Sequence, residues 1–235
     1  MLKQVDANLW ELERPLRTPG LRLKHRMTVA RLASGDLWVH SPVAFEEGIA
    51  WDLATLGPLR HFVAPSMFHD LHWPEWFARY PDATFYCAPG VKEEHPELPF
   101  QRVLSDTGRE PWETELPKLR IDGMPRLNEF VFLHVATRTL LVADLLFNLD
   151  PSTQPFLGKL FLRLNGLHGR VGCSRLFRWF IKDRRAFAAS VKVLLRWDVD
   201  RIVPGHGEII ATGGRDALVR AFTWLGPDHV SPASQ

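Results

Sequence analysis

The stretch RIVPGHGEII, residues 201–210, places a histidine between two glycines directly after a short apolar run. The apolar run predicts a buried strand. Glycine lets the backbone turn sharply, so Gly205 and Gly207 would leave the imidazole of His206 unobstructed. A rigidly presented histidine on a loop at the end of a strand suits metal ligation. The alternative is a plain turn that joins a strand to a helix.

A second stretch, LLVADLLFN at residues 140–148, places Asp144 at the end of a strongly apolar predicted strand. Burying a carboxylate there is costly unless the group is paired, hydrogen-bonded or bound to a metal. The carboxyl end of a strand is also where α/β folds place their chemistry. The alternative is that Asp144 caps the turn that follows.

A third stretch, APSMFHDLHW at residues 64–73, follows a short predicted strand and contains His69, Asp70 and His72. Imidazole and carboxylate groups together suit Zn²⁺ or Fe, or an acid–base pair. Short clusters of this kind are common, so the alternative is a polar loop with helix-capping groups.

In their order along the chain, the three stretches resemble the metallo-β-lactamase superfamily. The segment TRTLLVADLLF is similar to the strand that delivers a metal-bridging aspartate, here Asp144, and IVPGHGEII is similar to the segment that delivers the last histidine ligand, here His206. The resemblance extends from about residue 5 to about residue 225. It implies a layered α/β (α+β) fold, the αββα sandwich of the metallo-β-lactamases.

The chain departs from the signature loop of that superfamily, which reads H-x-H-x-D-H. Placing Asp70 on the aspartate leaves His69 and His72 each one residue out of register. Other residues then stand at or near four histidine positions: Ser66, Phe68, Leu71 and, in a later turn, Met124. Before the first helix, where the superfamily usually closes a strand with an aspartate, the chain reads LWVHSP.

The resemblance therefore implies a reduced metal site. Asp144 and His206 would be ligands, Asp70 would be a ligand or would orient the attacking water, and His69 would be a replacement ligand or a general base. We predict at most one tightly held Zn, Fe or Mn ion per chain. A site that holds no metal is the alternative.

If the protein is an enzyme, the resemblance implies metal-dependent hydrolysis of a small ester, lactone, amide or phosphoester. The alternative is a non-catalytic scaffold of the same fold that binds an anionic ligand or a partner through the basic helices of residues 151–201. The sequence leaves open which of the two it is, because a hydrolytic zinc needs about three protein ligands and an open position.

The composition is that of an ordinary globular protein, with 46% apolar and 24% charged residues. A net charge of +2 does not indicate a nucleic-acid-binding protein. Cys87 and Cys173 are too few for a disulfide framework. The sequence shows no signal peptide and no apolar run long enough to span a membrane. We expect one cytoplasmic domain, residues 1–235.

Local patterns predict the elements of this domain. The first 45 residues are rich in β-forming residues, and the polar end, residues 227–235, is expected to fray. Helical periodicity predicts helices over 155–167 and 174–197, within a helical insertion at 151–200. Strands are expected at 60–65, 83–89, 113–121, 128–134, 137–147 and 200–205, and further helical segments at 45–57, 74–81, 89–98 and 215–225.

Residues 151–201 contain eleven basic and three acidic residues, with aromatic residues between them. The ordinary interpretation is a solvated helix face on which arginine stems cover apolar surface. The functional interpretation is an anion site, with Arg184 and Arg185 binding an anionic small-molecule substrate. Contact of the basic helices with acidic lipid headgroups is a third interpretation.

Overall fold

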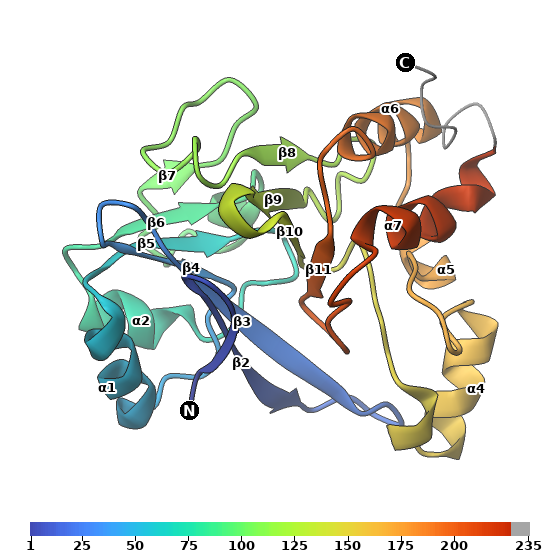
Figure 1. Cartoon of the computed structure of the whole chain (residues 1–235), viewed down its shortest axis with the longest axis horizontal. Coiled ribbons are helices and arrows are strands. Elements are labelled where there is room, and N and C mark those ends of the chain that lie inside the picture. The colour runs from blue at the N-terminus through green and yellow to red at the C-terminus, as the bar shows by residue number, and fades with distance from the viewer. Residues whose placement is uncertain (227–235) are drawn as a thin grey trace.

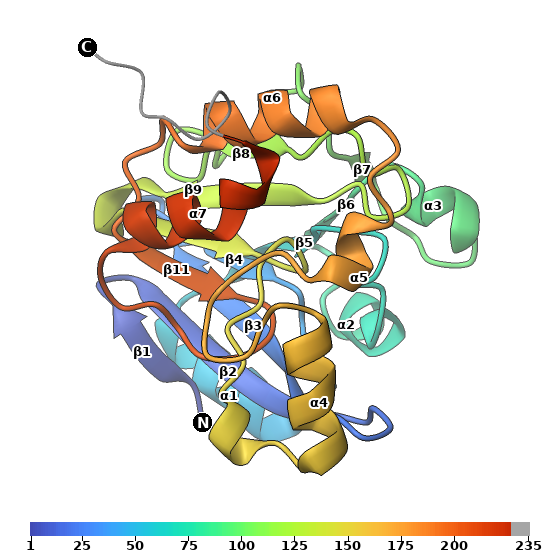
Figure 2. The same ribbon diagram turned by 90° about the vertical axis from the view of Figure 1, so that its right-hand side faces the viewer.

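The computed structural model describes residues 1–226. The segment expected to fray, residues 227–235, lies outside the described residues. Two β-sheets stack face to face, and helices cover the outer face of each (Figures 1 and 2). The predicted αββα sandwich is therefore confirmed.

The first sheet has seven strands in sequence order, β1 to β7. Its first four strands form an antiparallel meander, and the pairs from β4 onward are parallel. Helical crossovers explain the parallel half, because parallel strands need such connections. The strands are β1 (Lys3–Asp6), β2 (Leu9–Leu16), β3 (Leu23–Arg31), β4 (Leu37–His40), β5 (Leu59–Ala64), β6 (Thr84–Cys87) and β7 (Arg102–Val103).

The second sheet has four strands in the order β11-β10-β9-β8. Strands β8 (Lys118–Arg120), β9 (Phe130–His134) and β10 (Thr139–Val142) are antiparallel. Strand β11 (Arg201–Pro204) joins β10 in parallel after the long helical segment. Two elements that are far apart in sequence therefore lie side by side, which is what later builds the site.

Alternation along β9 divides the core into two layers. Phe130 and Phe132 point into the layer shared with the first sheet, whereas Val131 and Leu133 point toward the helices on the outer side. This is the period of two that a strand imposes on its side chains. Between the sheets, Trp38 on β4 packs against Phe132 and Trp112, with ring centroids 5.0 and 5.7 Å away.

The helices also bury their apolar side chains against the sheets. Ile49 and Leu53 of α1 and Trp73 and Trp76 of α2 bury their side chains in the core of the first sheet, and α6 and α7 cover the second. No helix among the described residues is long and apolar enough to cross a membrane. The α-helices are α1 (Glu47–Leu56), α2 (Trp73–Arg79), α3 (Val91–Glu94), α4 (Phe156–Leu164), α5 (Arg175–Arg178), α6 (Arg184–Leu194) and α7 (Gly214–Phe222), and the 3₁₀ turns are Val135–Thr137, Pro151–Thr153 and Thr223–Leu225.

The helix predicted over 174–197 is two helices. The carboxylate of Asp183 accepts hydrogen bonds from the backbone N–H groups of Arg185 and Ala186, at 2.9 and 3.0 Å, and so caps α6. The carbonyl of Gly123 holds the break by accepting from the N–H groups of Lys182 and Asp183. The strand predicted at 113–121 is likewise reduced to β8, because residues 111–116 form turns.

His40, at the end of β4, is a buried imidazole in this otherwise apolar layer. It lies 5.8 Å from the Trp38 ring and 5.7 Å from the Phe132 ring. Its Nε2 is buried without a hydrogen-bond partner among the described residues. The pKa of His40 is lowered to about 3, mainly by burial and secondly by the charge of His69.

This burial predicts acid-sensitive stability. Between the ordinary pKa of 6.5 and about 3, the unfolded chain protonates His40 and the folded chain does not, so stability falls as the pH falls through that window. We expect His40→Phe to remove this contribution. In urea unfolding followed at about pH 7 and about pH 4.5, the unfolding midpoint of the variant should fall less than that of the wild type. Equal falls would show that His40 is not held neutral.

Candidate metal centre

Three side chains from separate segments converge where strands of the two sheets end. His69, Asp144 and His206 each offer a ligand atom, and these atoms all lie within 4.8 Å of one another. In the parallel pair of β10 and β11, Val142 is opposite Pro204. The residues two positions further along, Asp144 and His206, therefore leave the sheet at the same edge. His69 reaches them from the loop after β5.

The carboxylate of Asp144 lies between the two imidazoles. Its Oδ2 is 3.5 Å from His69 Nε2, and its Oδ1 is 3.4 Å from His206 Nε2. Both distances exceed those of ordinary N–H···O hydrogen bonds. Within residues 1–226, His69 Nε2 and Asp144 Oδ2 are buried and have no hydrogen-bond partner. Polar atoms in such a position are expensive unless another group binds them.

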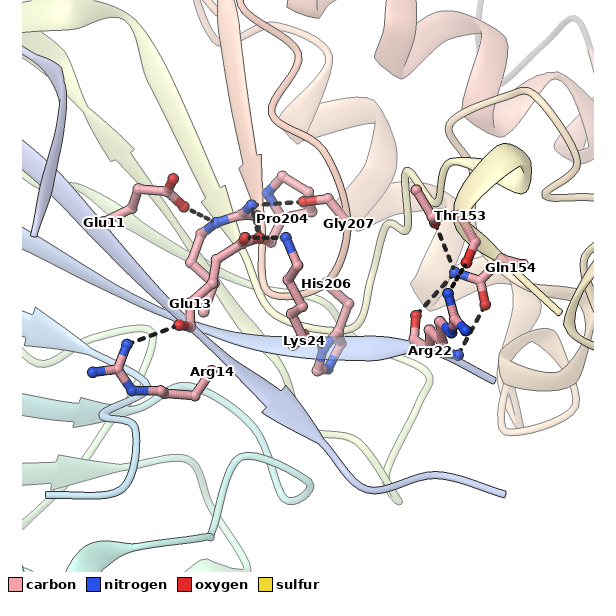
Figure 3. A network of polar contacts seen from close by, with 11 residues as sticks. Glu11, Glu13, Arg14, Arg22, Lys24, Thr153, Gln154, Pro204, His206 and Gly207 are labelled. Atoms are coloured by element: carbon pink, nitrogen blue, oxygen red, sulfur yellow. Dashed lines mark hydrogen bonds and ion pairs between the residues drawn. The ribbon is translucent and has the colours of Figure 1, made fainter. Parts of the chain in front are cut away.

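Hydrogen bonds on the far side fix both rings. His206 Nδ1 donates to the carbonyl of Lys24, at 2.6 Å, which turns its Nε2 toward Asp144; Figure 3 shows His206 beside Lys24. His69 Nδ1 lies 2.7 Å from the hydroxyl of Ser41. Metal-binding histidines usually carry a hydrogen bond of this kind on the other nitrogen.

Asp144 is fixed through its backbone by a buried carboxylic acid. Glu129 accepts hydrogen bonds from the N–H groups of Ala143 and Asp144, at 2.8 and 2.9 Å. Burial, and then the charge of Asp144, raises the pKa of Glu129 to about 8. Sequence reasoning missed Glu129, since it acts on backbone N–H groups that are distant in sequence and it carries no recognisable motif.

The charges within the cluster support one another. Burial alone would raise the pKa of Asp144, but the facing imidazoles outweigh it and hold that pKa below its usual range. Burial lowers the pKa of His206, yet the interaction with the facing carboxylate of Asp144 more than offsets this, and the pKa is raised above its ordinary value. The carboxylate thus stays ionised, as a metal ligand must.

The glycines beside His206 are required by contacts as well as by the turn. A Cβ on Gly205 would lie 2.8 Å from the carbonyl oxygen of Ala143 and 2.9 Å from Cε1 of His69. Gly207 has φ +95°, and a Cβ there would lie 2.2 Å from the carbonyl oxygen of Asn148. Glycine therefore allows the His206 loop to approach the loops that carry its neighbours.

A buried guanidinium connects this loop to the first sheet. Arg26 on β3 forms ion pairs with Glu11 and Glu13 of β2. It also donates to the carbonyls of Pro204 and Gly207, on either side of His206, and Figure 3 shows both glutamates facing that loop. The backbone N–H of Arg26 donates to the carbonyl of Gly205, at 3.0 Å. The position of His206 thus depends on β3.

The structure separates His69 from its neighbours in the loop. Asp70 lies outside the cluster, and its Oδ2 is 2.9 Å from His95 Nε2. His72 is exposed, with a left-handed backbone conformation (φ +66°) immediately before α2. His25 on β3, which sequence reasoning missed, lies inside instead, with its ring centroid 4.9 Å from that of His69. Burial, and then the neighbouring imidazoles, holds the pKa of His25 well below its ordinary value.

Arg184 and Arg185, expected to bind an anionic substrate, are not brought to the cluster. They begin α6, which covers the outer face of the second sheet. Arg184 Nη2 donates to the carbonyl of Trp224, at 3.1 Å, and the guanidinium lies over the Trp224 ring. Neither arginine lines the cavity next to Asp144 and His206.

That cavity is strongly apolar. It has a volume of about 280 Å³, and its polar lining consists of Asp144, His206 and Ser174. The ring of Phe147 stacks on His206, with centroids 5.7 Å apart. The apolar lining comes from the β2–β3 hairpin, the loops and helices α4 and α5: Leu16, Leu21, Leu23, Phe68, Phe147, Leu149, Phe161, Leu167, Leu176 and Phe177.

The residues present fit a metal ion. Two imidazole nitrogens and a carboxylate oxygen are a ligand set for zinc or for iron, and three protein ligands leave room for water or substrate. The unpartnered, buried atoms of His69 and Asp144 face each other across the position that an ion would take. No rearrangement of the imidazole-orienting hydrogen bonds is needed for such binding.

Comparison with solved structures defines the class: the chain has the metallo-β-lactamase fold. It is similar to a metallo-β-lactamase from Pontibacter korlensis (13% identity, TM-score 0.66, 96% of this chain and 98% of that one). It is also similar to the metallo-β-lactamase FIM-1 from Pseudomonas aeruginosa in its mono-zinc form (14%, 0.61, 98% and 96%). A third similar structure is the metal-soaked Flv1 flavodiiron core from Synechocystis sp. PCC6803 (11%, 0.61, 96% and 60%).

Within that fold, the chain belongs to the family described as "Domain of unknown function (DUF4336)", whose model matches residues 6–161. The matched range includes His69 and Asp144. A search of curated proteins gave no match. The metallo-β-lactamase fold that the resemblance predicted is confirmed by the similar solved structures.

Arg26 provides a test of how the site is supported. Arg26→Met would leave the buried carboxylate of Glu11 and two carbonyls without their partner, whereas Glu13 would keep its ion pair with Lys24, so we expect a loss of about 3–5 kcal/mol in the free energy of unfolding. Arg14→Met is the matched control, because the pair of Arg14 with Glu46 is exposed and should contribute under about 1 kcal/mol. Urea unfolding at neutral pH measures both. Similar losses in the two variants would contradict the role of Arg26.

Proposed function

We propose that the protein is a metal-dependent hydrolase that uses one metal ion, held by His69, Asp144 and His206. The observation that carries the proposal is the pair of unpartnered buried atoms, His69 Nε2 and Asp144 Oδ2, 3.5 Å apart. A structural ion pair would close that distance and form hydrogen bonds. An arrangement that keeps ligand atoms apart, with their far sides already fixed, is typical of a metal site.

A zinc, iron or manganese ion held there would supply Lewis-acid activation of water and of a carbonyl oxygen. The protein does the rest. Lys24 and Ser41 hold the two imidazoles in orientation, and Glu129 holds the backbone that carries Asp144. The apolar cavity excludes water from the reacting group and binds the remainder of the substrate.

The cavity lining supports a substrate with an apolar part next to the bond that is cleaved. Apart from Asp144 and His206, one serine is the polar group in the lining. Beyond the proposed metal site the lining has no arginine or lysine, so a phosphoester or another strongly anionic group would be desolvated there at a high cost. Among the candidates that the sequence left open, a small hydrophobic ester or lactone therefore fits best.

Metal content tests the ligand set independently of activity. After loading with zinc and desalting, we expect about one tightly bound ion per wild-type chain, measured by inductively coupled plasma mass spectrometry. His69→Ala and His206→Ala should each abolish retention, because two protein ligands hold an ion weakly. Asp70→Asn is the matched control and should retain the ion. Unchanged retention in His206→Ala would remove it from the site, and loss in Asp70→Asn would make Asp70 a ligand.

Ester hydrolysis tests the substrate class. For the metal-loaded protein, we expect kcat/KM to be higher for p-nitrophenyl hexanoate than for the acetate, by about four-fold per CH₂ that the cavity buries. Leu21→Glu, in the lining, should lower the value for the hexanoate more than for the acetate. Val103→Glu, on the distant strand β7, is the control and should change neither.

Two other outcomes would contradict this proposal. A protein that retains one ion but hydrolyses no ester or lactone would favour the non-catalytic scaffold. A preference for the acetate over the hexanoate would show that the cavity does not receive the acyl chain.

A further inference from the structure

Helix α4 exposes large apolar side chains on its outer face. Phe156 is 78% exposed, and Leu157, Leu160 and Leu164 are also exposed. Residues 156, 160 and 164 follow the four-residue spacing of one helix face, and residue 157 lies beside them. The opposite side of the helix is buried through Gly158 and Leu162. Helix α4 therefore carries apolar residues on its solvent-facing side as well as on the side that packs against the protein.

Helix α5 extends this surface. The carbonyl of Leu164 accepts from Arg175 Nη1, at 3.3 Å, and the side chain of Asn165 accepts from the N–H of Leu176. Leu176, itself exposed, therefore follows directly on the end of α4. We refer to Phe156, Leu157, Leu160, Leu164 and Leu176 as the α4 face. Contiguous exposed apolar side chains of this size mark an interaction surface.

Basic residues surround the α4 face. Lys159 and Arg163, four residues apart on α4, flank its apolar residues, and Arg175 lies at its end. From Pro151 to Lys182 the sequence has no aspartate or glutamate. Among the ion pairs of the described residues, none involves Lys159, Arg163 or Arg175. Their positive charge is thus available to a partner.

The α4 face adjoins the apolar cavity. Phe161 of α4 and Leu176 line that cavity. The β2–β3 hairpin reaches α4 in Figure 1, where Arg22 and Gln154 exchange hydrogen bonds at 2.9 Å (Figure 3). Gly20, at the hairpin tip, packs close to Leu157. A molecule that leaves a surface on which α4 rests would therefore meet the cavity directly.

We propose that the α4 face docks on the surface of an anionic phospholipid bilayer. The apolar side chains would enter the boundary between headgroups and acyl chains, and the surrounding lysine and arginines would contact the anionic headgroups. A second copy of this chain fits less well. A symmetric contact through the α4 face would bring the same positive charges of two molecules together, with no acidic residues nearby to neutralise them.

Sedimentation with vesicles tests the proposal on the full chain. We expect the protein to pellet with phosphatidylcholine vesicles that contain phosphatidylserine, to pellet far less with phosphatidylcholine alone, and to be released by salt. Phe156→Ser with Leu160→Ser should weaken the partition coefficient at least about ten-fold. Lys159→Glu with Arg163→Glu should weaken it more than about twenty-fold, since each basic residue contributes about five-fold.

Trp51→Ser is the matched control, because Trp51 is 74% exposed on α1, on the other side of the molecule, and its loss should leave binding unchanged. Circular dichroism and urea unfolding confirm that each variant is folded. The proposal is overturned if anionic vesicles do not bind the wild type at low salt, or if Trp51→Ser lowers binding as much as the α4 variants. It is also overturned if the wild type does not bind vesicles but forms a dimer in ultracentrifugation, and the double variant Phe156→Ser with Leu160→Ser disrupts that dimer. Metal retention does not enter these outcomes, so they stand apart from the proposed hydrolase activity.

Discussion

A positive charge buried between two sheets determines how the rest of the molecule is arranged. The guanidinium of Arg26 is almost fully enclosed, so it requires acidic partners, and Glu11 and Glu13 supply them from the same face of β2. Its remaining donors have carbonyls on either side of His206 as acceptors. Because Lys24, two residues earlier on β3, also orients His206, one short piece of strand in the first sheet fixes a loop that belongs to the second.

The sequence predicts those parts of this arrangement for which a local pattern is specific. Asp144 ends an apolar strand and His206 stands between two glycines. Each stretch thus contains a polar residue in a position that an ordinary strand or turn does not require. The αββα layering followed from the resemblance that these stretches carry in order. The structure then brings both side chains to one edge through the parallel register of β10 and β11, a pairing that no local pattern specifies.

Other features were not accessible from local rules. His69 and Asp70 are adjacent in a turn, where neighbouring side chains point in different directions, and composition cannot choose between them. His25 lies in a strand that is buried on both faces, so its pattern resembles that of a core strand. Glu129 acts through backbone N–H groups that are distant in sequence. The break before α6 depends on Gly123, whose contact with residues 182 and 183 is tertiary.

The order of strands also has a consequence for synthesis. Each strand of the first sheet pairs with its neighbour in the chain, so this sheet can form as the first 103 residues leave the ribosome. Arg26, however, lies 178 residues before Pro204, and β11 is the last strand to be made. Until β11 arrives, the core between the sheets lacks Val203, and the buried guanidinium of Arg26 lacks the carbonyl of Pro204. We therefore expect the nascent protein to be most prone to aggregation in this interval, and His206 to join His69 and Asp144 only once the last strand is in place.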